Sequence, residues 1–160
     1  MSAIPIEVLK ERFIYNARTG EFFHRKSGKP AGSLNHDGYP VVKVEHDGRR
    51  IQIAIHKAAF AIYHGRYPEG ELDHRDTKRT NIRIRNLREA TRVQNMANVR
   101  RKGKLPKGVT LSGGVSNPYR AQIRIEGRQV YLGRFPDKKQ AHAAYVAKAI
   151  EIHGEFARAR

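Results

Sequence analysis

The sequence contains no cysteine, which rules out a disulfide framework and any cysteine-based zinc site. It also lacks a long apolar run, because its most apolar window, residues 51–63, is interrupted by His56 and Lys57; we therefore expect no membrane span. Residues 1–13 include acidic side chains and no extended apolar stretch, which argues against a signal peptide. These absences predict a soluble, cytoplasmic protein with no membrane partner.

Acidic residues are also scarce, since 15 Asp and Glu stand against 32 Lys and Arg and leave a net charge of +17. The imbalance is greatest over residues 100–160, where 14 Lys and Arg accompany 4 Asp and Glu, for a net +10. Such an excess predicts a polyanionic partner, either nucleic acid or an anionic membrane surface. We favour nucleic acid, because a membrane-bound helix needs bulky apolar residues and the C-terminal helix carries mostly alanine on its apolar side.

The first part of the chain has the pattern of a β-rich segment between two helices. Apolar residues fall near one face across residues 5–15, which predicts a short helix. A strand begins near residue 22, and a hairpin spans residues 41–55 with its turn at an Asp-Gly pair, a dipeptide typical of tight hairpins. Residues 56–64 then predict a second helix, which Gly65 ends.

Residues 71–98 have the order strand, loop, strand, helix. A polar, turn-prone segment, residues 75–81, follows the first strand. Residues 82–87 alternate in a period of two, and this pattern predicts the second strand. Thr91 is placed to cap the helix that follows, on which we expect a short apolar stripe. That stripe consists of Val93, Met96 and Ala97.

Four polar residues in this segment have the chemistry of a hydrolytic metal site: Asp73, His74, Asn86 and Asn95. Mg²⁺ prefers oxygen ligands, which the Asp73 carboxylate and the Asn95 amide would supply. A near-neutral imidazole is suited to take a proton from water, so His74 is the candidate general base, and Asn86 would hydrogen-bond its ring. Adjacent strand residues point to opposite sides, so a bend or bulge must turn Asp73 or His74 toward a common cleft.

At these four positions the sequence resembles the homing-type HNH endonucleases, whose shared element is the ββα-metal motif. The resemblance implies that His74 is the general base and that Asn86 orients it. It also implies that Asp73 and Asn95 bind one divalent cation, Mg²⁺ or another such as Mn²⁺. The family often has a histidine at the position of His56 as well. For His56 we prefer a hydrogen-bonded, partly buried residue at the strand–helix junction over a catalytic role.

A second unit follows a basic stretch. Residues 100–106 contain Gly and Pro and no apolar core residues, which predicts a linker that is solvated or lies along phosphate. A short strand over residues 108–114 and a hairpin over 117–136 precede a helix over 138–154. On the central strand small and apolar residues alternate with long polar ones, so one face should pack on the helix and the other should form a polar row.

Residues 107–158 resemble the AP2/ERF DNA-binding domain. The resemblance rests on the Gly-Val pair at 108, the YRAQIRI strand, the Tyr-Leu-Gly sequence at 131, Phe135, the alanine-rich helix and Gly154. It implies a three-stranded sheet that lies in the major groove of DNA. The candidate DNA contacts are Lys107, Arg120, Gln122, Arg124, Gln129 and Tyr131. The chain departs from the family in having no tryptophan and in having Gln129 where arginine is frequent.

These patterns predict an α+β chain. Residues 1–99 would hold a β-rich lead-in and a ββα-metal HNH module, residues 100–106 the linker, and residues 107–160 an AP2-like three-stranded antiparallel sheet packed on one helix. The predicted function is a metal-dependent, site-recognising endonuclease that hydrolyses phosphodiester bonds of duplex DNA in a phage or bacterial host cell, with no protein partner indicated. The alternative is a DNA-binding regulator whose HNH fold does not cut. An RNA-binding module is a weaker alternative, because the sequence lacks an aromatic platform for single strands.

Overall fold

The computed structural model describes residues 4–99, 103–113 and 115–157, and the chain divides into two compact units, Met1–Arg92 and Val93–Arg160. We describe each unit by itself. The division falls earlier in the chain than the predicted linker, so the helix that carries Asn95 groups with the second unit. Part of that linker, residues 100–102, lies outside the described residues. Among the described residues, no helix combines the length and the apolar character needed to cross a membrane.

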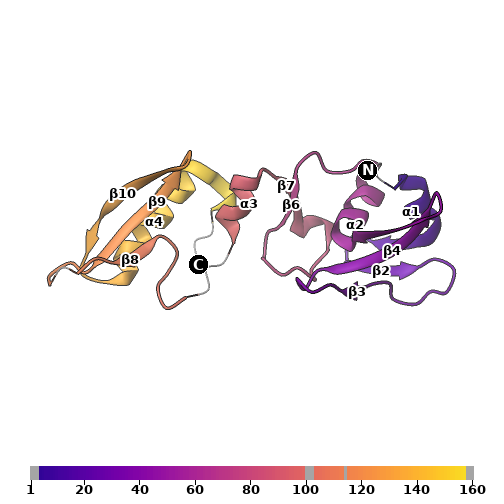
Figure 1. Ribbon diagram of the computed structural model, residues 1–160, viewed down its shortest axis with the longest axis horizontal. Coiled ribbons are helices and arrows are strands. Elements are labelled where there is room, and N and C mark those ends of the chain that lie inside the picture. Colours follow the sequence, from indigo (N-terminus) through magenta and orange to yellow (C-terminus); the bar gives the residue numbers. More distant parts are fainter. Residues whose placement is uncertain (1–3, 100–102, 114, 158–160) are drawn as a thin grey trace. The chain divides into compact units, whose positions relative to one another are not determined.

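The first unit combines two helices with three small antiparallel sheets over its described residues (Figure 1). The sheets pair β1 with β2, β3 with β4 and β5, and β6 with β7. The elements, in chain order, are α1 (Ile6–Arg12), β1 (Phe13–Asn16), β2 (Glu21–His24), β3 (Ser33–Leu34), β4 (Pro40–His46), β5 (Arg49–Ala54), α2 (Ile55–His64), β6 (Glu71–His74), the 3₁₀ helix η1 (Ile84–Asn86) and β7 (Leu87–Ala90).

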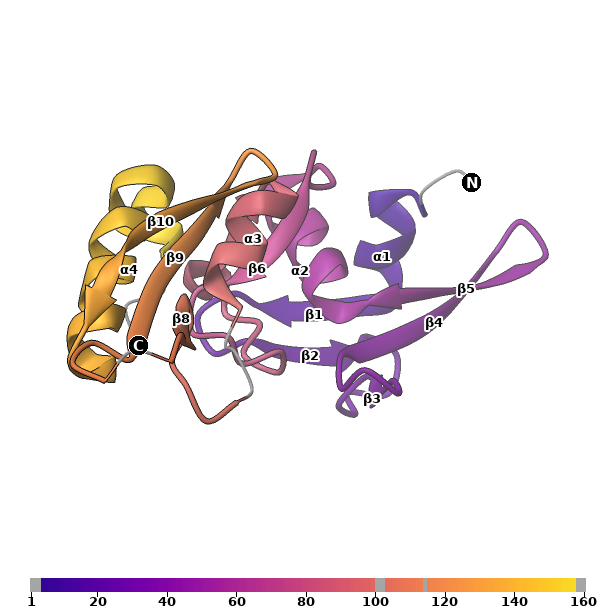
Figure 2. The same cartoon turned by 60° about the vertical axis from the view of Figure 1, so that its left-hand side comes forward.

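The β4–β5 hairpin and the end of α2 confirm two local predictions. Asp47 and Gly48 connect the strands with positive φ angles of 50° and 68°, the conformation that an Asp-Gly turn supplies. In Figure 2 this hairpin extends beyond the rest of the first unit. Gly65 ends α2 in the left-handed conformation, and its N–H donates to the carbonyl of Ala61.

The core of the first unit lies where α1 and α2 meet the strands. Leu9 of α1, Phe13 of β1 and Val44 of β4 are almost completely buried, together with Ala58 and Ala59 of α2. Small alanine side chains let α2 lie close against its neighbours, so the helix that begins next to the candidate site is held rigidly by packing.

The first helix is shorter than predicted. It ends at Arg12, and Phe13 instead begins β1, where it pairs with His24. The ring of Phe13 packs 5.0 Å from that of Phe22, so sheet pairing and burial outweigh continuation of the helix.

The strand predicted over residues 82–87 is wrong. Ile84–Asn86 form a 3₁₀ turn, and the second strand of this sheet begins only at Leu87. The alternation of residue types that suggested a strand does correspond to an alternation in exposure, since Arg83 and Arg85 are exposed and Asn86 is buried. Extended backbone at Arg83 followed by a single tight turn produces the same alternation, because it also directs successive side chains to different sides.

The second unit is a three-stranded antiparallel sheet with a long helix against one face (Figure 1). The sheet order is β10-β9-β8, and the β9–β10 turn has positive φ angles at Glu126 and Gly127, as predicted for the hairpin. Asp137 caps the N-terminus of the long helix, accepting hydrogen bonds from the backbone N–H groups of Lys139 and Gln140. The elements are α3 (Arg92–Asn98), β8 (Val109–Leu111), β9 (Tyr119–Ile125), β10 (Arg128–Phe135), α4 (Lys138–His153) and the 3₁₀ helix η2 (Gly154–Phe156).

The apolar stripe predicted on α3 is buried only in part. The helix begins directly after Thr91, as expected, and Ala97 is buried. Val93 and Met96, however, are 66% and 60% exposed. The three- and four-residue spacing thus identified the helix but not the side that packs.

Close contact between Gly108 and Tyr145 fixes the start of β8 against α4. Gly108 has φ of +80°, and a Cβ atom at this position would lie 2.0 Å from Cδ2 of Tyr145. Tyr145 is buried between the sheet and the helix. Only glycine therefore allows the chain to enter β8 at this distance from the ring.

We predict that Gly108→Ala lowers the free energy of unfolding by about 3 kcal/mol or more, because a left-handed backbone penalty adds to overpacking of the ring. Gly113→Ala is the matched control: Gly113 also has positive φ, +67°, but its Cβ would meet nothing within 4 Å. Gly113→Ala should lower the free energy of unfolding by only about 1 kcal/mol. Denaturant unfolding followed by circular dichroism measures both, and equal losses would contradict the contact with Tyr145.

Candidate active site and nucleic-acid interface

Asp73 forms a buried ion pair with Arg88 across the β6–β7 sheet. The two residues are direct partners in the antiparallel register, and both are buried. Nε of Arg88 donates to Oδ2 of Asp73 at 2.8 Å, and Nη2 lies 2.8 Å from the same oxygen in the ion pair. Sequence reasoning missed Arg88, and the signal that identifies it is the register, which places it opposite the carboxylate. Removing either partner would leave a buried charge without its counter-ion.

His74 follows Asp73 at the end of β6 and makes different contacts. Its ring packs edge-on against His56, with 5.1 Å between centroids, and lies 6.4 Å from the ring of Tyr39. The β6–β7 pairing runs without a break through His74, so the bulge expected to turn one of the two side chains is not formed in this ladder. Asp73 thus meets Arg88, and His74 meets the aromatic cluster.

The environment of His74 favours its neutral form. Burial lowers the pKa of His74, and Arg79 lowers it further, while Asp76 and Asp73 act in the opposite direction. A neutral imidazole is the form that accepts a proton, so the burial of His74 suits a general base at neutral pH.

His56 lies in the first turn of α2, at the junction between β5 and the helix, as predicted. It is buried, its ring is 5.5 Å from that of Tyr39, and its Nδ1 has no hydrogen-bond partner within the described part of the chain. The expected hydrogen bond is therefore not made at Nδ1. Burial, with smaller contributions from His74 and Lys57, lowers the pKa of His56 to about 3.

Asn86 organises the loop that follows His74. Its side-chain Nδ2 donates to Oδ1 of Asp76 at 3.0 Å and to the carbonyl of Asn81 at 2.7 Å, and its Oδ1 accepts from the Asp76 N–H at 3.1 Å. These bonds go to the loop and not to the imidazole, in contrast to the predicted bond with His74. The connection from Asn86 to His74 runs through the loop backbone, where the His74 carbonyl accepts from the Thr77 N–H.

Asp76 and Asn81 are two further members of this network that sequence reasoning treated only as turn residues. Burial alone would raise the pKa of Asp76, but hydrogen bonds from Asn81, from the Lys78 N–H and from Asn86 outweigh it and lower the pKa. The network is closed by the bond from Asn81 Nδ2 to Asp76 Oδ2 at 2.6 Å. Polar residues spaced around a turn are the only sequence signal for it.

Asn95 lies on α3 in the second unit, whereas Asp73 lies in the first, so their pairing as metal ligands stays a prediction. The donor chemistry fits Mg²⁺, since a carboxylate and an amide both offer oxygen. In the described ranges, no group of three or more His, Asp and Glu side chains is placed to hold a metal ion.

Five of the six predicted DNA contacts lie on one face of the β9–β10 hairpin. Arg124 pairs with Gln129, and Gln122 pairs with Tyr131, so these side chains share the face opposite α4. The guanidinium of Arg120 lies 5.2 Å from the centre of the Tyr131 ring. We call these five residues, Arg120, Gln122, Arg124, Gln129 and Tyr131, the polar sheet face.

Register adds two residues to the polar sheet face that sequence reasoning missed. Thr110 of β8 and Arg134 of β10 both pair with Arg120, and direct partners in a ladder point to the same side. A shift in the ladder between Tyr131 and Gly133 puts Arg134 on this side. Strict alternation along the sequence therefore cannot find it.

Lys107 is the sixth predicted contact, and its ammonium group is used elsewhere. It donates to the carbonyls of Met96, Ala97 and Val99 at 2.8, 2.7 and 3.3 Å. A cation at the C-terminal end of a helix satisfies carbonyls that lack intrahelical partners. Lys107 thus caps α3, and a role in DNA binding stays a prediction.

We predict that acid weakens the first unit through His56. Its folded pKa, about 3, is lower than the ordinary value of 6.5, so the unfolded chain binds more protons between these values. The free energy of unfolding should fall by up to ~1.4 kcal/mol per pH unit as the pH drops below 6.5. Denaturant titrations from pH 7 to pH 4 test this: His56→Phe should flatten the dependence, and His36→Phe, at an exposed position, should not. An unchanged slope in His56→Phe would contradict the assignment.

Comparison with known proteins identifies the segment that carries these residues. Residues 54–97 match the sequence model of a family described as HNH endonuclease. The match begins at the end of β5 and includes α2, β6, η1, β7 and nearly all of α3. All four predicted site residues lie within it.

Two individual proteins are similar to this chain. The H-N-H endonuclease F-TflI of Escherichia phage T5 is 28% identical over 98 residues, which are 59% of this chain and 50% of that protein. A structure described as "DNA binding and cleavage by the HNH homing endonuclease I-HmuI" is 29% identical and covers 61% of this chain and 57% of that one, with a TM-score of 0.47. The chain therefore spans about half the length of these relatives. The family match at residues 54–97 supports the prediction of an HNH endonuclease domain.

Proposed function

We propose that this protein is a metal-dependent, site-recognising DNA endonuclease of the homing type. The observation that carries the proposal is that the segment matching the HNH endonuclease family contains Asp73, His74, Asn86 and Asn95, with His74 buried and its pKa lowered. Because the chain spans only about half of each relative, the activity, substrate and partner of the whole protein are part of this proposal.

His74 is the residue that takes the proton from the attacking water. Its lowered pKa keeps the ring neutral, and packing against His56 and Tyr39 restricts its orientation. Asn86 is a positioning residue: it holds the loop whose Thr77 N–H bonds to the His74 carbonyl. Loss of Asn86 would misplace the imidazole without removing it.

Asp73 and Asn95 would hold the divalent cation, Mg²⁺ or another such as Mn²⁺. Mg²⁺ is commonly bound by one or two protein oxygens together with substrate phosphate and water, which agrees with a donor set of one carboxylate and one amide. When bound, the cation would stabilise negative charge on the scissile phosphate and the leaving oxygen. Arg88 fixes the Asp73 carboxylate through a hydrogen bond from Nε and an ion pair with Nη2, which orients the ligand before substrate arrives.

The polar sheet face is the surface that we propose to recognise the target site in duplex DNA, in the manner implied by the AP2/ERF resemblance. Arginine and glutamine make paired hydrogen bonds to guanine and adenine edges in the major groove. The face carries these residue types side by side on β9 and β10, and residues 100–160 carry the net charge of +10 that a phosphate-rich partner attracts.

We predict that His74→Ala abolishes cutting but retains DNA binding. General base catalysis typically raises the rate by ~10²–10⁴-fold, and His74→Ala removes the base. Because the His74 ring is neutral, the substitution does not change the net charge at the DNA-binding surface. Asp73→Ala should also lose cutting, and higher Mg²⁺ should restore part of it, because the remaining ligands still bind metal weakly. His74→Ala should show no such recovery. Purified full-length protein, DNA carrying the natural target, and a titration of Mg²⁺ measure these differences.

Two outcomes would contradict the proposal: full activity of His74→Ala, or undiminished cutting in excess chelator. Either result, with DNA binding intact, would favour the DNA-binding regulator. His46→Ala is a matched control, because His46 lies at the tip of the β4–β5 hairpin, away from the predicted site residues on β6. It should cut like the wild-type protein.

For the polar sheet face, we predict that Arg124→Ala weakens site preference by about 1–3 kcal/mol if the side chain reads a base. Arg128→Ala is the matched control: it makes the same change of charge on the same hairpin, but Arg128 pairs with Ile125 and so shares the side that packs on α4. Competition binding in chelator between target and unrelated duplexes gives the preference. Equal effects of the two variants on site preference would contradict recognition by this face.

A further inference from the structure

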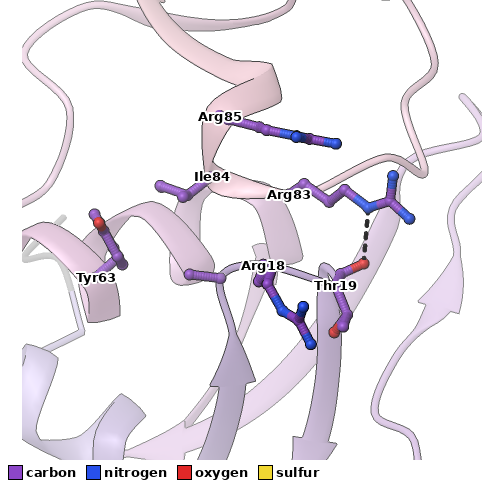
Figure 3. A pocket seen from close by; sticks show the side chains of 7 residues that line it. Arg18, Thr19, Tyr63, Arg83, Ile84 and Arg85 are labelled. Atoms are coloured by element: carbon purple, nitrogen blue, oxygen red, sulfur yellow. Dashed lines mark hydrogen bonds between the residues drawn. The ribbon is translucent and has the colours of Figure 1, made fainter.

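We propose that a basic pocket on the first unit binds a backbone phosphate of the DNA duplex, in addition to the candidate active site and the polar sheet face. This inference rests on the proposed function for its substrate. The pocket has a volume of about 630 Å³ (Figure 3). It is lined by Ala17, Arg18, Thr19, Tyr63, Arg83, Ile84 and Arg85.

The walls of this pocket are joined by one backbone and one side-chain hydrogen bond between segments far apart in sequence. The turn between β1 and β2 accepts two hydrogen bonds from the η1 region: Ile84 N–H to the Ala17 carbonyl at 3.1 Å, and Arg83 Nε to the Thr19 carbonyl at 3.2 Å. Gly20, with φ of +80°, lies so close to the η1 region that a Cβ atom on it would be 2.9 Å from the backbone nitrogen of Arg83. These contacts hold the walls of the pocket in place before any ligand binds.

The side chains that line the pocket are net positive, and the nearby Glu21 carboxylate accepts a hydrogen bond from the Thr19 hydroxyl. None of its lining residues is acidic, and its three arginines are exposed. Within the described residues, none of these three guanidinium groups is in an ion pair, and in Figure 3 they extend toward the same side of the pocket. Exposed like charges repel only weakly in water, and an anion bound between them would relieve that repulsion.

A phosphodiester matches this site better than a free nucleotide does. Guanidinium groups bind phosphate oxygens through paired, charge-assisted hydrogen bonds, and three of them can contact one or two neighbouring phosphates. Recognition of a base needs stacking partners or groups that read its edge. The lining offers one aromatic ring, Tyr63, against three cations.

The pocket is connected to the candidate active site through η1. Arg83 and Arg85 lie on this turn or beside it, and Asn86, which ends it, holds Asp76 and Asn81. The next residue, Leu87, pairs with His74. A phosphate held by the arginines would therefore anchor the duplex a few residues from the proposed base and align the scissile bond with it.

The test is the double variant Arg18→Ala/Arg85→Ala in the full-length protein. Arg83 is kept, because it bonds to the Thr19 carbonyl. If each arginine contacts one phosphate, the slope of log K against log salt should become less steep by about 1.8, because each lost contact with duplex DNA removes about 0.9. Affinity should fall on target and unrelated duplexes alike, KM should rise, and kcat should change little.

Arg49→Ala/Arg50→Ala is the matched control. It removes the same charge from the tip of the β4–β5 hairpin, where Arg49 and Arg50 lie beside Glu45 and Asp47. Its salt slope should stay close to that of the wild-type protein. If the first double variant fails to fold by circular dichroism, Arg85→Gln replaces it, with an expected change in slope of about 0.9.

Three outcomes would overturn the proposal. Equal salt slopes for the two double variants would show that the pocket does not contact DNA. A loss of preference for the target, with unrelated duplexes unaffected, would make the arginines base-reading groups. Binding of millimolar inorganic phosphate to the wild-type protein but not to the Arg18/Arg85 variant, with no displacement of DNA at constant ionic strength, would identify a site for small anions.

The outcome is separable from that of the proposed nuclease activity. If the wild-type protein binds DNA but does not cut it with Mg²⁺, and the slope still changes in the Arg18/Arg85 variant, the nuclease proposal fails and the phosphate site stands. If the wild-type protein cuts and the slopes do not differ, the nuclease proposal stands and the phosphate site fails.

Discussion

The buried ion pair between Asp73 and Arg88 is the interaction on which the candidate active site depends. The β6–β7 sheet has only two strands of four residues each, and such a sheet gains little stability from its backbone bonds alone. A hydrogen bond and an ion pair from one guanidinium to one carboxylate oxygen connect its strands across the middle of the ladder. Breaking a buried pair from one side typically costs ~3–5 kcal/mol, so the pair constrains which substitutions the site tolerates. It also orients the carboxylate that we propose to hold a cation, because a buried charged side chain held by a hydrogen bond and an ion pair has little freedom left.

Local signals in the sequence were sufficient for the two hairpin turns and for the end of α2. The Asp47-Gly48 and Glu126-Gly127 turns and the end of α2 at Gly65 follow from backbone preferences that a few neighbouring residues determine. The placement of long polar side chains on one side of β9 follows from the period of two, which the sheet enforces. The segment chosen for its polar residues and their spacing lies within residues 54–97, which match the HNH endonuclease family, and the roles of Asp73 and His74 stay a prediction.

Contacts set by pairing across the chain could not be predicted in the same way. The 3₁₀ turn at Ile84–Asn86 has the exposure pattern of a strand, and only its bonds to the β1–β2 turn and to Asn81 distinguish the two. Arg88 is an ordinary surface residue in sequence and becomes a buried partner of Asp73 only through the register of β6 and β7. Arg134 joins the polar sheet face because the ladder shifts by one residue after Tyr131. In each case a long-range pairing, absent from any local window, decides where the side chain points.

Arginine has two different roles in the first unit, and exposure to solvent distinguishes them. Arg88 is buried and paired with Asp73, so its charge is not available to bind DNA. Arg18, Arg83 and Arg85 are exposed, and the backbone around them is fixed while their charges face solvent. Phosphate binding needs accessible cations, whereas orientation of a metal ligand needs a cation that cannot leave. Because η1 and β7 are consecutive, one short segment carries both kinds of arginine within six residues, from Arg83 to Arg88. This proximity would couple binding of the DNA backbone to the geometry of the proposed reaction.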